Sequence, residues 1–403
     1  MKCIVGWRIT TNAHSRRLLL SASTLRMIPT SLNTTSTTSS KETHSAPVET
    51  RRSFVTSPQQ HFGDISGGHE RFQEREREIL ARFDSPLDRL VLTADGTLQL
   101  VVSAWHNRVV TVNPVRIDEI SDELRVEREV ELLLGSLEDD DNKLFCRAVS
   151  TIKYENRDLM DKARGCGIGQ MFRVWNLLPT FQLLDANLDS VTGELSRKYN
   201  LSAPGVVCTI LETFPINPLL LPVLPTEAPS SSPRLKRDAV ESKGVKSDAR
   251  LAAMPPDLSP MQRVFCAASG NVQRLASAAL GEQIHIRLLK EEAEETGSFT
   301  REVELLSTSS GNRFCLAQTT IDIHDDQMRE KVASGDIPLG SLVSMLGAFP
   351  DFKLLNVNWV SPTRFSRLYR MNIAANQVEL VVREDFDWEP FPQLSMSDKS
   401  CRQ

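Results

Sequence analysis

The sequence predicts an α+β fold made of two tandem copies of one domain, each a roughly six-stranded antiparallel sheet flanked by helices. Three observations lead to this prediction. The six residues REVELL occur twice, at 128–133 and at 301–306. Longer segments on both sides of REVELL also match, in the same order. Within each copy, strand-like segments follow one another in runs, which is typical of antiparallel α+β folds.

The repeat extends far beyond REVELL. The segment SPLDRLVLTADGTLQLVVSA at 85–104 matches SPMQRVFCAASGNVQRLASA at 259–278 without a gap, and LSRKYNL at 195–201 matches FSRLYRM at 365–371. Between matched segments the copies differ at turn-like stretches such as GSLEDDDNK and STSSGNR, where changes of length are tolerated. Several matches in one order indicate a tandem duplication.

The duplication divides the chain into five parts. Residues 1–60 precede the repeat, the first copy spans 70–217, and the second copy spans 257–392. Residues 218–256 are rich in Pro, Ser and alternating charge and show no periodic apolar face, so they read as a flexible linker. An ordered excursion packed on one domain is the alternative. Residues 393–403 are expected to be a disordered tail.

The N-terminal 60 residues differ in composition from the rest. The first acidic residue is Glu42, whereas Ser, Thr and Arg are frequent, and SRRLLLSASTLRM can form a basic amphipathic helix. This pattern is typical of a mitochondrial transit peptide. The alternative is a disordered N-terminal tail on a cytoplasmic protein.

Composition excludes several classes of function. The net charge of -5 provides no basic surface for nucleic acid, so no nucleic-acid partner is expected. The seven cysteines form no CxxC pair, which indicates reduced thiols instead of a disulfide framework. Histidines, cysteines and carboxylates show no metal-ligand spacing. The apolar runs are too short for a membrane span.

Each copy is expected to open with two helices. Ser-Pro at the head of each matched segment is a helix start, and apolar residues follow at helical spacing. Asp95-Gly96, matched by Ser269-Gly270, ends this first helix, and a second short helix follows.

Six strands are expected after these helices. RVVTV, REVELL and FCRAVSTI in the first copy, matched by QIHIRLL, REVELL and FCLAQTTI, predict a meander of three strands. The pattern turns helical near Gly169 and Gly340. FQLLDAN, LSRKYNL and GVVCTILETF then predict three closing strands, which FKLLNVNWV, SRLYRMNI and QVELVVREDF match in the second copy.

Strand parity places four charged residues on the apolar face of the sheets. Side chains alternate across a strand, so Arg128 and Arg301 share a face with the apolar residues of REVELL. Glu212 and Glu384 likewise share a face with the aliphatic residues of the last strand of each copy. Each copy therefore directs one arginine and one glutamate inward.

Two explanations account for the inward charges, because a buried charge without a partner costs several kcal/mol. One is a buried arginine–glutamate pair that only supports the structure. The other is a largely apolar pocket in which the two groups, set apart, hold a polar ligand. A guanidinium binds a carboxylate with two parallel hydrogen bonds, and a carboxyl group can exchange a proton or hold a hydroxyl.

Four motifs together resemble chorismate pyruvate-lyase and its relatives. They are the Arg-Glu opening of a mid-domain strand, Pro-Leu-Gly before a helix, an Arg-x-Tyr hairpin strand, and a last strand ending in Glu-x-Phe. The resemblance covers about residues 82–217 and 257–388. It implies two chorismate-lyase-like domains, each with a six-stranded antiparallel sheet flanked by helices.

The resemblance also implies a site and a reaction. The strand arginine would bind the substrate carboxylate together with the backbone of the Pro-Leu-Gly loop, and the glutamate of the last strand would handle a proton. The matching substrate-binding positions are Arg301, Leu339 and Gly340 in the second copy and Arg128, Ile168 and Gly169 in the first; the catalytic ones are Glu384 and Glu212. The enzyme would be a carbon–oxygen lyase that converts chorismate to 4-hydroxybenzoate and pyruvate without metal or cofactor.

The chain departs from the family pattern in two respects. It is doubled, and residues 166–169 of the first copy, CGIG, replace Pro-Leu-Gly. The second copy is therefore the more typical site, and another carboxylated ring compound is an open alternative to chorismate. Two other functions also stay open. One is a protein of the same fold that binds an aromatic carboxylate without turnover, and the other is an assembly protein in which the copies form a pseudo-dimer within a monomer.

Overall fold

A computed structural model describes the repeated part of the chain. The described residues are 67–94, 98–135, 143–221, 254–269, 272–294, 297–334, 342, 346–373 and 377–394. Residues 1–60, where a transit peptide is expected, and most of the linker lie outside this set. So do Leu339 and Gly340.

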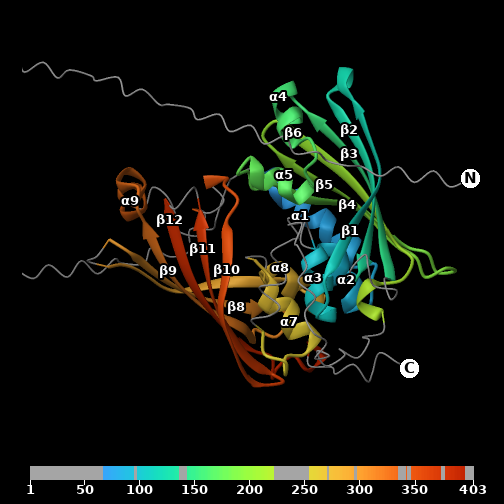
Figure 1. The fold of residues 1–403 in the computed structure, drawn as a ribbon. Helices are drawn as coiled ribbons and strands as arrows, with labels where there is room; N and C mark the ends of the chain where they lie inside the picture. The colour runs from blue at the N-terminus through green and yellow to red at the C-terminus, as the bar shows by residue number, and fades with distance from the viewer. Residues whose placement is uncertain are drawn as a thin grey trace, which may run out of the picture. The chain divides into compact units, whose positions relative to one another are not determined.

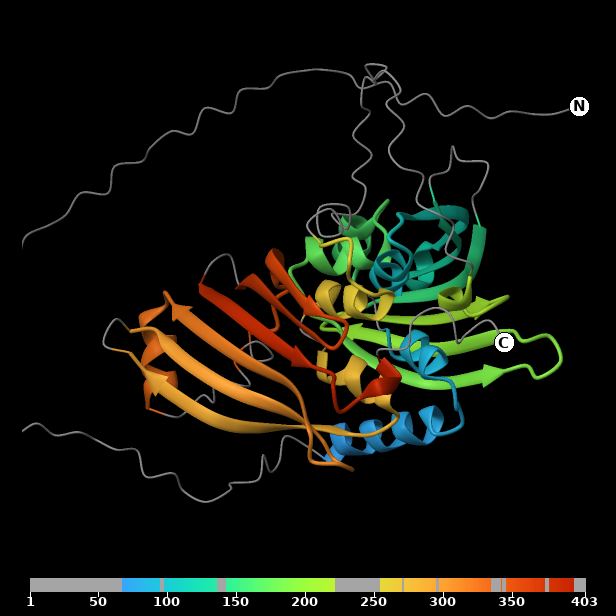
Figure 2. The same ribbon diagram turned by 90° about the horizontal axis from the view of Figure 1, so that it is seen from below.

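Two six-stranded antiparallel sheets form the framework, one in each copy, as the sequence predicts (Figures 1 and 2). The first sheet has the order β1-β2-β3-β6-β5-β4. Its strands are β1 (Val110–Ile120), β2 (Arg125–Leu134), β3 (Lys143–Tyr154), β4 (Thr180–Leu188), β5 (Leu195–Ala203) and β6 (Val206–Phe214). The second sheet has the order β10-β11-β12-β9-β8-β7. Its strands are β7 (Ile284–Ala293), β8 (Phe299–Ser307), β9 (Arg313–Ile323), β10 (Asp351–Ser361), β11 (Arg364–Ile373) and β12 (Val378–Asp387).

Each sheet consists of two three-stranded meanders joined through their last strands. In the first copy β3 pairs with β6, so the meander β1–β3 and the meander β4–β6 meet at the centre of the sheet. β12 and β9 make the same junction in the second copy. The first strands of the meanders, β1 and β4 or β7 and β10, are therefore the edges.

The edge strands of the two sheets have β-bulges at the same position of the repeat. β1 is bulged between Pro114 and Arg116 where it pairs with β2, and β7 is bulged between Leu288 and Lys290 where it pairs with β8. These two bulges stand at matched positions of the repeat. A bulge adds one residue to a strand and tends to be retained as a feature of the fold. The registers therefore support the tandem duplication.

Short helices precede and interrupt the meanders, and those at the head of each repeated segment stand where they were expected. The described helices are α1 (Gly67–Leu80), α2 (Pro86–Thr93), α3 (Leu98–His106), α4 (Arg157–Ala163), α5 (Ile168–Val174), α7 (Pro260–Ala267), α8 (Val272–Leu280) and α9 (Asp326–Ala333). The hydroxyls of Ser85 and Ser259 cap α2 and α7 by accepting a hydrogen bond from the backbone three residues on. These caps confirm the predicted Ser-Pro helix starts.

The opening helices of the two copies contact each other in a reciprocal way. Arg89 of α2 donates from Nε to the carbonyl oxygen of Ala278 in α8 at 2.7 Å. Arg263 of α7 donates from Nε to the carbonyl oxygen of Ala104 in α3 at 2.8 Å. Arg89 matches Arg263 in the repeat, and Ala104 matches Ala278. This matched pair of contacts, made in both directions, is what a two-fold interface shows.

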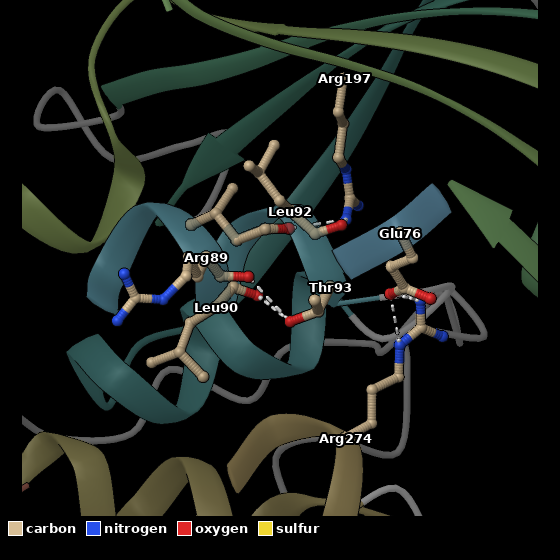
Figure 3. Close-up of polar contacts among 8 residues, drawn as sticks. Glu76, Arg89, Leu90, Leu92, Thr93, Arg197 and Arg274 are labelled. Carbon is tan, nitrogen blue, oxygen red and sulfur yellow. Dashed lines mark hydrogen bonds and ion pairs between the residues drawn. The ribbon is translucent and has the colours of Figure 1, made fainter. Parts of the chain in front are cut away.

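Helix α1 was not predicted from the sequence. Its sequence, GGHERFQEREREIL, is mostly charged and lacks a regular apolar stripe. Glu76 in this helix pairs with Arg274 of α8, with 2.5 Å between Oε1 and Nη2 (Figure 3). The guanidinium of Arg274 also lies over the ring of Phe181 in β4, 4.1 Å from its centroid. α1 is thus held by contacts distant in sequence.

The ends of the copies extend slightly beyond the predicted boundaries. Pro218–Leu220 forms a short 3-10 helix in which Pro218 and Leu219 are buried, and it contacts α2 and α3. Leu394, in a similar turn at Pro392–Leu394, is also buried. Within the described residues no helix is long and apolar enough to cross a membrane.

Candidate ligand site on the inner face of the first sheet

The predicted alternation is confirmed on the last strand of each sheet. We call the inner face the side of each sheet that carries the buried residues of these strands. In β6 they are Val206, Cys208, Ile210, Glu212 and Phe214; in β12 they are Val378, Leu380, Val382, Glu384 and Phe386. Both glutamates are thus inward, and each is less than one-tenth exposed.

The partner of Glu212 is the arginine of the hairpin-strand motif, which the sequence analysis had not placed in the site. Arg197 of β5, paired directly opposite Glu212, donates from Nε to Oε2 of Glu212 at 2.7 Å. The hydroxyl of Tyr199 donates to Oε1 of the same carboxylate at 2.9 Å. Both carboxylate oxygens are therefore occupied by donors from one neighbouring strand.

The second copy repeats this arrangement. Arg367 of β11 donates from Nε to Oε2 of Glu384 at 2.6 Å, and the hydroxyl of Tyr369 donates to Oε1 at 3.0 Å. We call these groups the Arg–Tyr–Glu networks: Arg197, Tyr199 and Glu212 in the first copy, and Arg367, Tyr369 and Glu384 in the second. Their presence in both copies links them to the fold common to the two domains.

The arginine of each network also caps a helix. Nη1 of Arg197 donates to the carbonyl oxygens of Val91 and Leu92 at 2.6 and 3.0 Å, at the C-terminal end of α2 (Figure 3). A cation is favourable there because the last carbonyls of a helix lack partners and carry partial negative charge. Arg367 does the same for α7, donating to the carbonyl oxygens of Phe265 and Cys266 at 2.7 and 3.1 Å.

Burial makes the ionisation of these networks unusual. Burial raises the pKa of the Tyr199 hydroxyl well above its usual range, and the negative charge of Glu212 adds to this effect. Burial, the largest single effect, would lower the pKa of Arg197, but the charge and hydrogen bond of Glu212 together with the nearby Tyr199 and Cys146 outweigh it and raise the pKa overall. The first network therefore holds a charged arginine and a neutral tyrosine around one carboxylate.

Arg128 is inward as predicted but lies apart from Glu212. It is 8% exposed and shares a row of paired residues with Ser150 of β3 and Ile210 of β6, whereas Glu212 is in the next row, opposite Ala148. Two strand spacings of about 4.8 Å separate β2 from β6, so the backbones of the two residues are about 10 Å or more apart. This distance agrees with the interpretation in which Arg128 and Glu212 are set apart to hold a ligand. Glu212, however, is already paired with Arg197.

Arg128 uses only part of its guanidinium. Nη1 donates to the carbonyl oxygen of Cys166 at 2.5 Å, while Nε is buried and has no hydrogen-bond partner among the described residues. Cys166 lies two residues before α5, which begins at Ile168 and continues through the exposed Gly169. The structure thus brings Arg128 to the loop that the resemblance implies, and Nε of its guanidinium has no hydrogen-bond partner among the described residues.

Aromatic side chains lie close to this arginine. The ring of Trp175, just after α5, packs edge-on against Tyr154 of β3, with centroids 6.1 Å apart, and the indole Nε1 is buried without a hydrogen-bond partner among the described residues. Burial raises the pKa of Tyr154, and the nearby positive charge of Arg128 acts in the opposite direction. Tyr154 thus packs against Trp175 and lies within the electrostatic influence of Arg128.

The matching arginine of the second copy has an acidic neighbour. Nε of Arg301 lies 3.5 Å from Oε2 of Glu291 in β7, a charge contact without hydrogen-bond geometry. The Arg301 side chain is 18% exposed and Glu291 is 38% exposed. Leu339 and Gly340, expected beside Arg301, lie outside the described residues.

Two open hollows lie on the second sheet, with volumes of about 440 and 270 Å³. The larger is bordered by Arg301 and by outward residues such as Glu302 and Arg383, and the smaller by residues such as Asn358 and Arg364. Neither is bordered by Glu384 or Tyr369. These two hollows are thus not the enclosed pocket between the inward arginine and glutamate that the functional interpretation expects.

Sequence alternation could have revealed Arg197 and Arg367. LSRKYNL places Leu195, Arg197, Tyr199 and Leu201 on one face, and FSRLYRM has the same alternation. The two segments had been matched as a repeat, but their parity had not been followed. In the described residues, no group of three or more His, Cys, Asp or Glu is placed to hold a metal ion.

Comparison with known proteins adds no family to this description. No protein-family model and no curated protein sequence matches the chain.

Proposed function

We propose that this protein binds a small molecule through a carboxylate group and that Arg128 receives that group. The observation that carries the proposal is the buried Nε of Arg128, which has no hydrogen-bond partner among the described residues. Leaving a buried donor unpaired costs about 1–3 kcal/mol, and more when the group is charged. A carboxylate bound along the Nε edge would remove this cost with two charge-assisted hydrogen bonds.

A purely structural role explains the Arg–Tyr–Glu networks but not Arg128. In the networks every carboxylate oxygen has a donor, so Glu212 and Glu384 need no ligand. Among the described residues Arg128 has no carboxylate partner, and the one hydrogen bond that it makes there is to the carbonyl oxygen of Cys166. Tyr154 and Trp175 would give an aromatic carboxylate flat apolar surfaces beside the charged group.

Turnover of chorismate is the second candidate function. It is favoured by the contact between Arg128 and Cys166, because the resemblance to chorismate pyruvate-lyase implies that the strand arginine and this loop act together. The elimination needs a ligand that is oriented and one proton that is managed. Glu212 would have to release Arg197 or Tyr199 before it served as the proton carrier. For this reason we place binding before catalysis.

One titration tests both candidates. The full-length chain is titrated with 4-hydroxybenzoate in a calorimeter and separately incubated with chorismate, with 4-hydroxybenzoate formation followed by absorbance. Saturable binding that Arg128→Ala abolishes supports the proposal, and Arg128→Lys is the matched control that keeps the charge but loses the planar fork. Product formation above the uncatalysed rate would establish the lyase. If the chain binds neither compound, this ligand class is wrong.

A further inference from the structure

We infer that the first copy alone holds the carboxylate ligand and that Glu291 closes the matching site in the second copy. This inference rests on the proposed function and reverses the preference that the Pro-Leu-Gly motif suggests. It follows from two differences between the copies at matched positions. Each difference favours an anion beside Arg128 and disfavours one beside Arg301.

The first difference is the residue of the edge strand that pairs with the inward arginine. Ile117 of β1 is the pairing partner of Arg128, and Glu291 of β7 is the pairing partner of Arg301. Directly paired residues of antiparallel strands are on the same face and close enough to interact. The arginine of the first copy therefore has an aliphatic neighbour, whereas that of the second has a carboxylate 3.5 Å away.

In the first copy Glu119 does not pair with Arg128 in the way that Glu291 pairs with Arg301. It lies two residues beyond Ile117 on the same face of β1, but its carboxylate accepts a hydrogen bond from Nη2 of Arg164 at 2.7 Å and another from the Ser121 hydroxyl at 3.1 Å. Arg164 lies in the loop between α4 and α5. Glu119 is thus paired with another cation, and Arg128 has no ion-pair partner among the described residues.

The second difference is the set of aromatic donors. In the repeat, Tyr154 matches Ile323 and Trp175 matches Leu346. The second copy therefore lacks both the tyrosine whose hydroxyl senses the charge of the arginine and the indole that packs against that tyrosine. Indole N–H groups donate hydrogen bonds and aromatic rings pack against a ligand ring, and aliphatic side chains provide neither interaction.

Exchange of the edge residues tests the inference. The full-length chain and its variants are titrated calorimetrically with 4-hydroxybenzoate. We expect one molecule bound per chain, at least about tenfold weaker binding in Ile117→Glu, and less than about twofold change in Glu291→Ile and Arg301→Ala. Ile117→Gln, of similar size but uncharged, should bind like the parent. Because position 117 is exposed, this pair remains informative even if a buried arginine variant fails to fold.

The outcomes separate the two proposals. If the parent chain binds no 4-hydroxybenzoate, both the proposed function and the inference fail for this ligand class. If the parent binds but Arg301→Ala loses binding, or two molecules bind per chain, the assignment to the first copy is overturned while the proposed function stands. If Ile117→Glu binds as well as Ile117→Gln, the role given to Glu291 is overturned.

Discussion

Glu212 accepts hydrogen bonds from both Arg197 and Tyr199, at 2.7 and 2.9 Å, in the interior of the first sheet. The same arginine extends to the carbonyl oxygens at the end of α2. One buried ion pair therefore joins two strands and a helix that are about 100 residues apart in the sequence. Since the second copy has the same contacts, this network belongs to the common fold.

Removal of Arg197 should strongly destabilise the first copy. Arg197→Ala leaves the carboxylate of Glu212 buried without its cation and the end of α2 without its cap, and breaking such a buried pair costs about 3–5 kcal/mol. The free energy of unfolding in urea measures the loss. The double variant Arg197→Met/Glu212→Leu removes both charges and should recover much of it. A loss below about 1 kcal/mol in Arg197→Ala would contradict the structural role of the network.

The hydrogen bonds that Arg89 and Arg263 make between the two copies should contribute about equally to stability. Arg89→Ala removes the hydrogen bond to the Ala278 carbonyl and two bonds within the first copy, and Arg263→Ala removes two bonds to the first copy, at the carbonyls of Ala104 and Trp105, and one within the second copy. Because a hydrogen bond to a charged group contributes about 1.5–3 kcal/mol, each variant should lower the midpoint of thermal unfolding by several degrees. Unequal effects, with one variant like the parent, would contradict a two-fold interface.

Alkaline pH should destabilise the protein from about pH 9 upward. Burial raises the pKa of Cys208 and of Cys266 from 9.0 to about 12, so between these pH values the unfolded chain loses protons that the folded chain keeps. Stability is complete below the unfolded pKa and falls as pH rises toward the folded value, by about 1.4 kcal/mol per pH unit for each thiol. Urea unfolding at pH 8, 9, 10 and 11 measures the slope.

Cys208→Ala provides the control for the pH effect. The variant is less stable at pH 8 because it leaves a small cavity, but its share of the alkaline slope should be absent. The Tyr199 hydroxyl, whose pKa is also raised by burial, adds to the slope only above about pH 10. A free energy of unfolding that is constant from pH 8 to pH 11 would contradict the burial of these thiols.

The fold could be predicted because its determinants are local and occur twice. Turn residues and alternation place the strands, and the repeat confirms each assignment by a second example. The same alternation correctly turns Arg128 and Glu212 inward. Arg197 lies opposite Glu212 because β5 and β6 form a hairpin around Pro204 and Gly205, so following the register of this hairpin in the sequence would have found the partner. The pairing of β3 with β6, which sets the separation of Arg128 from Glu212, is distant in sequence, and alternation does not encode it.

The different neighbours of Arg128 and Arg301 were also missed because the register of the strands had not been followed in the sequence. In the sequence, Ile117 and Glu291 are edge-strand residues without a recognisable motif. Their importance appears only when the register places each one opposite an inward arginine. Motif matching favours the second copy, because it has Pro-Leu-Gly, whereas the contacts favour the first. The charge next to the arginine is a more direct guide to anion binding than the loop motif.

The central claim is that the Nε group of Arg128 receives a carboxylate, and NMR of the arginine side chains tests it most directly. The Nε–H resonances of the ¹⁵N-labelled chain are assigned with Arg128→Lys and Arg301→Lys, and 4-hydroxybenzoate is then added. A saturable shift of the Arg128 resonance, with that of Arg301 unchanged, is the predicted result. A shift confined to Arg301, or no shift at either arginine while ligand binds, would contradict the claim.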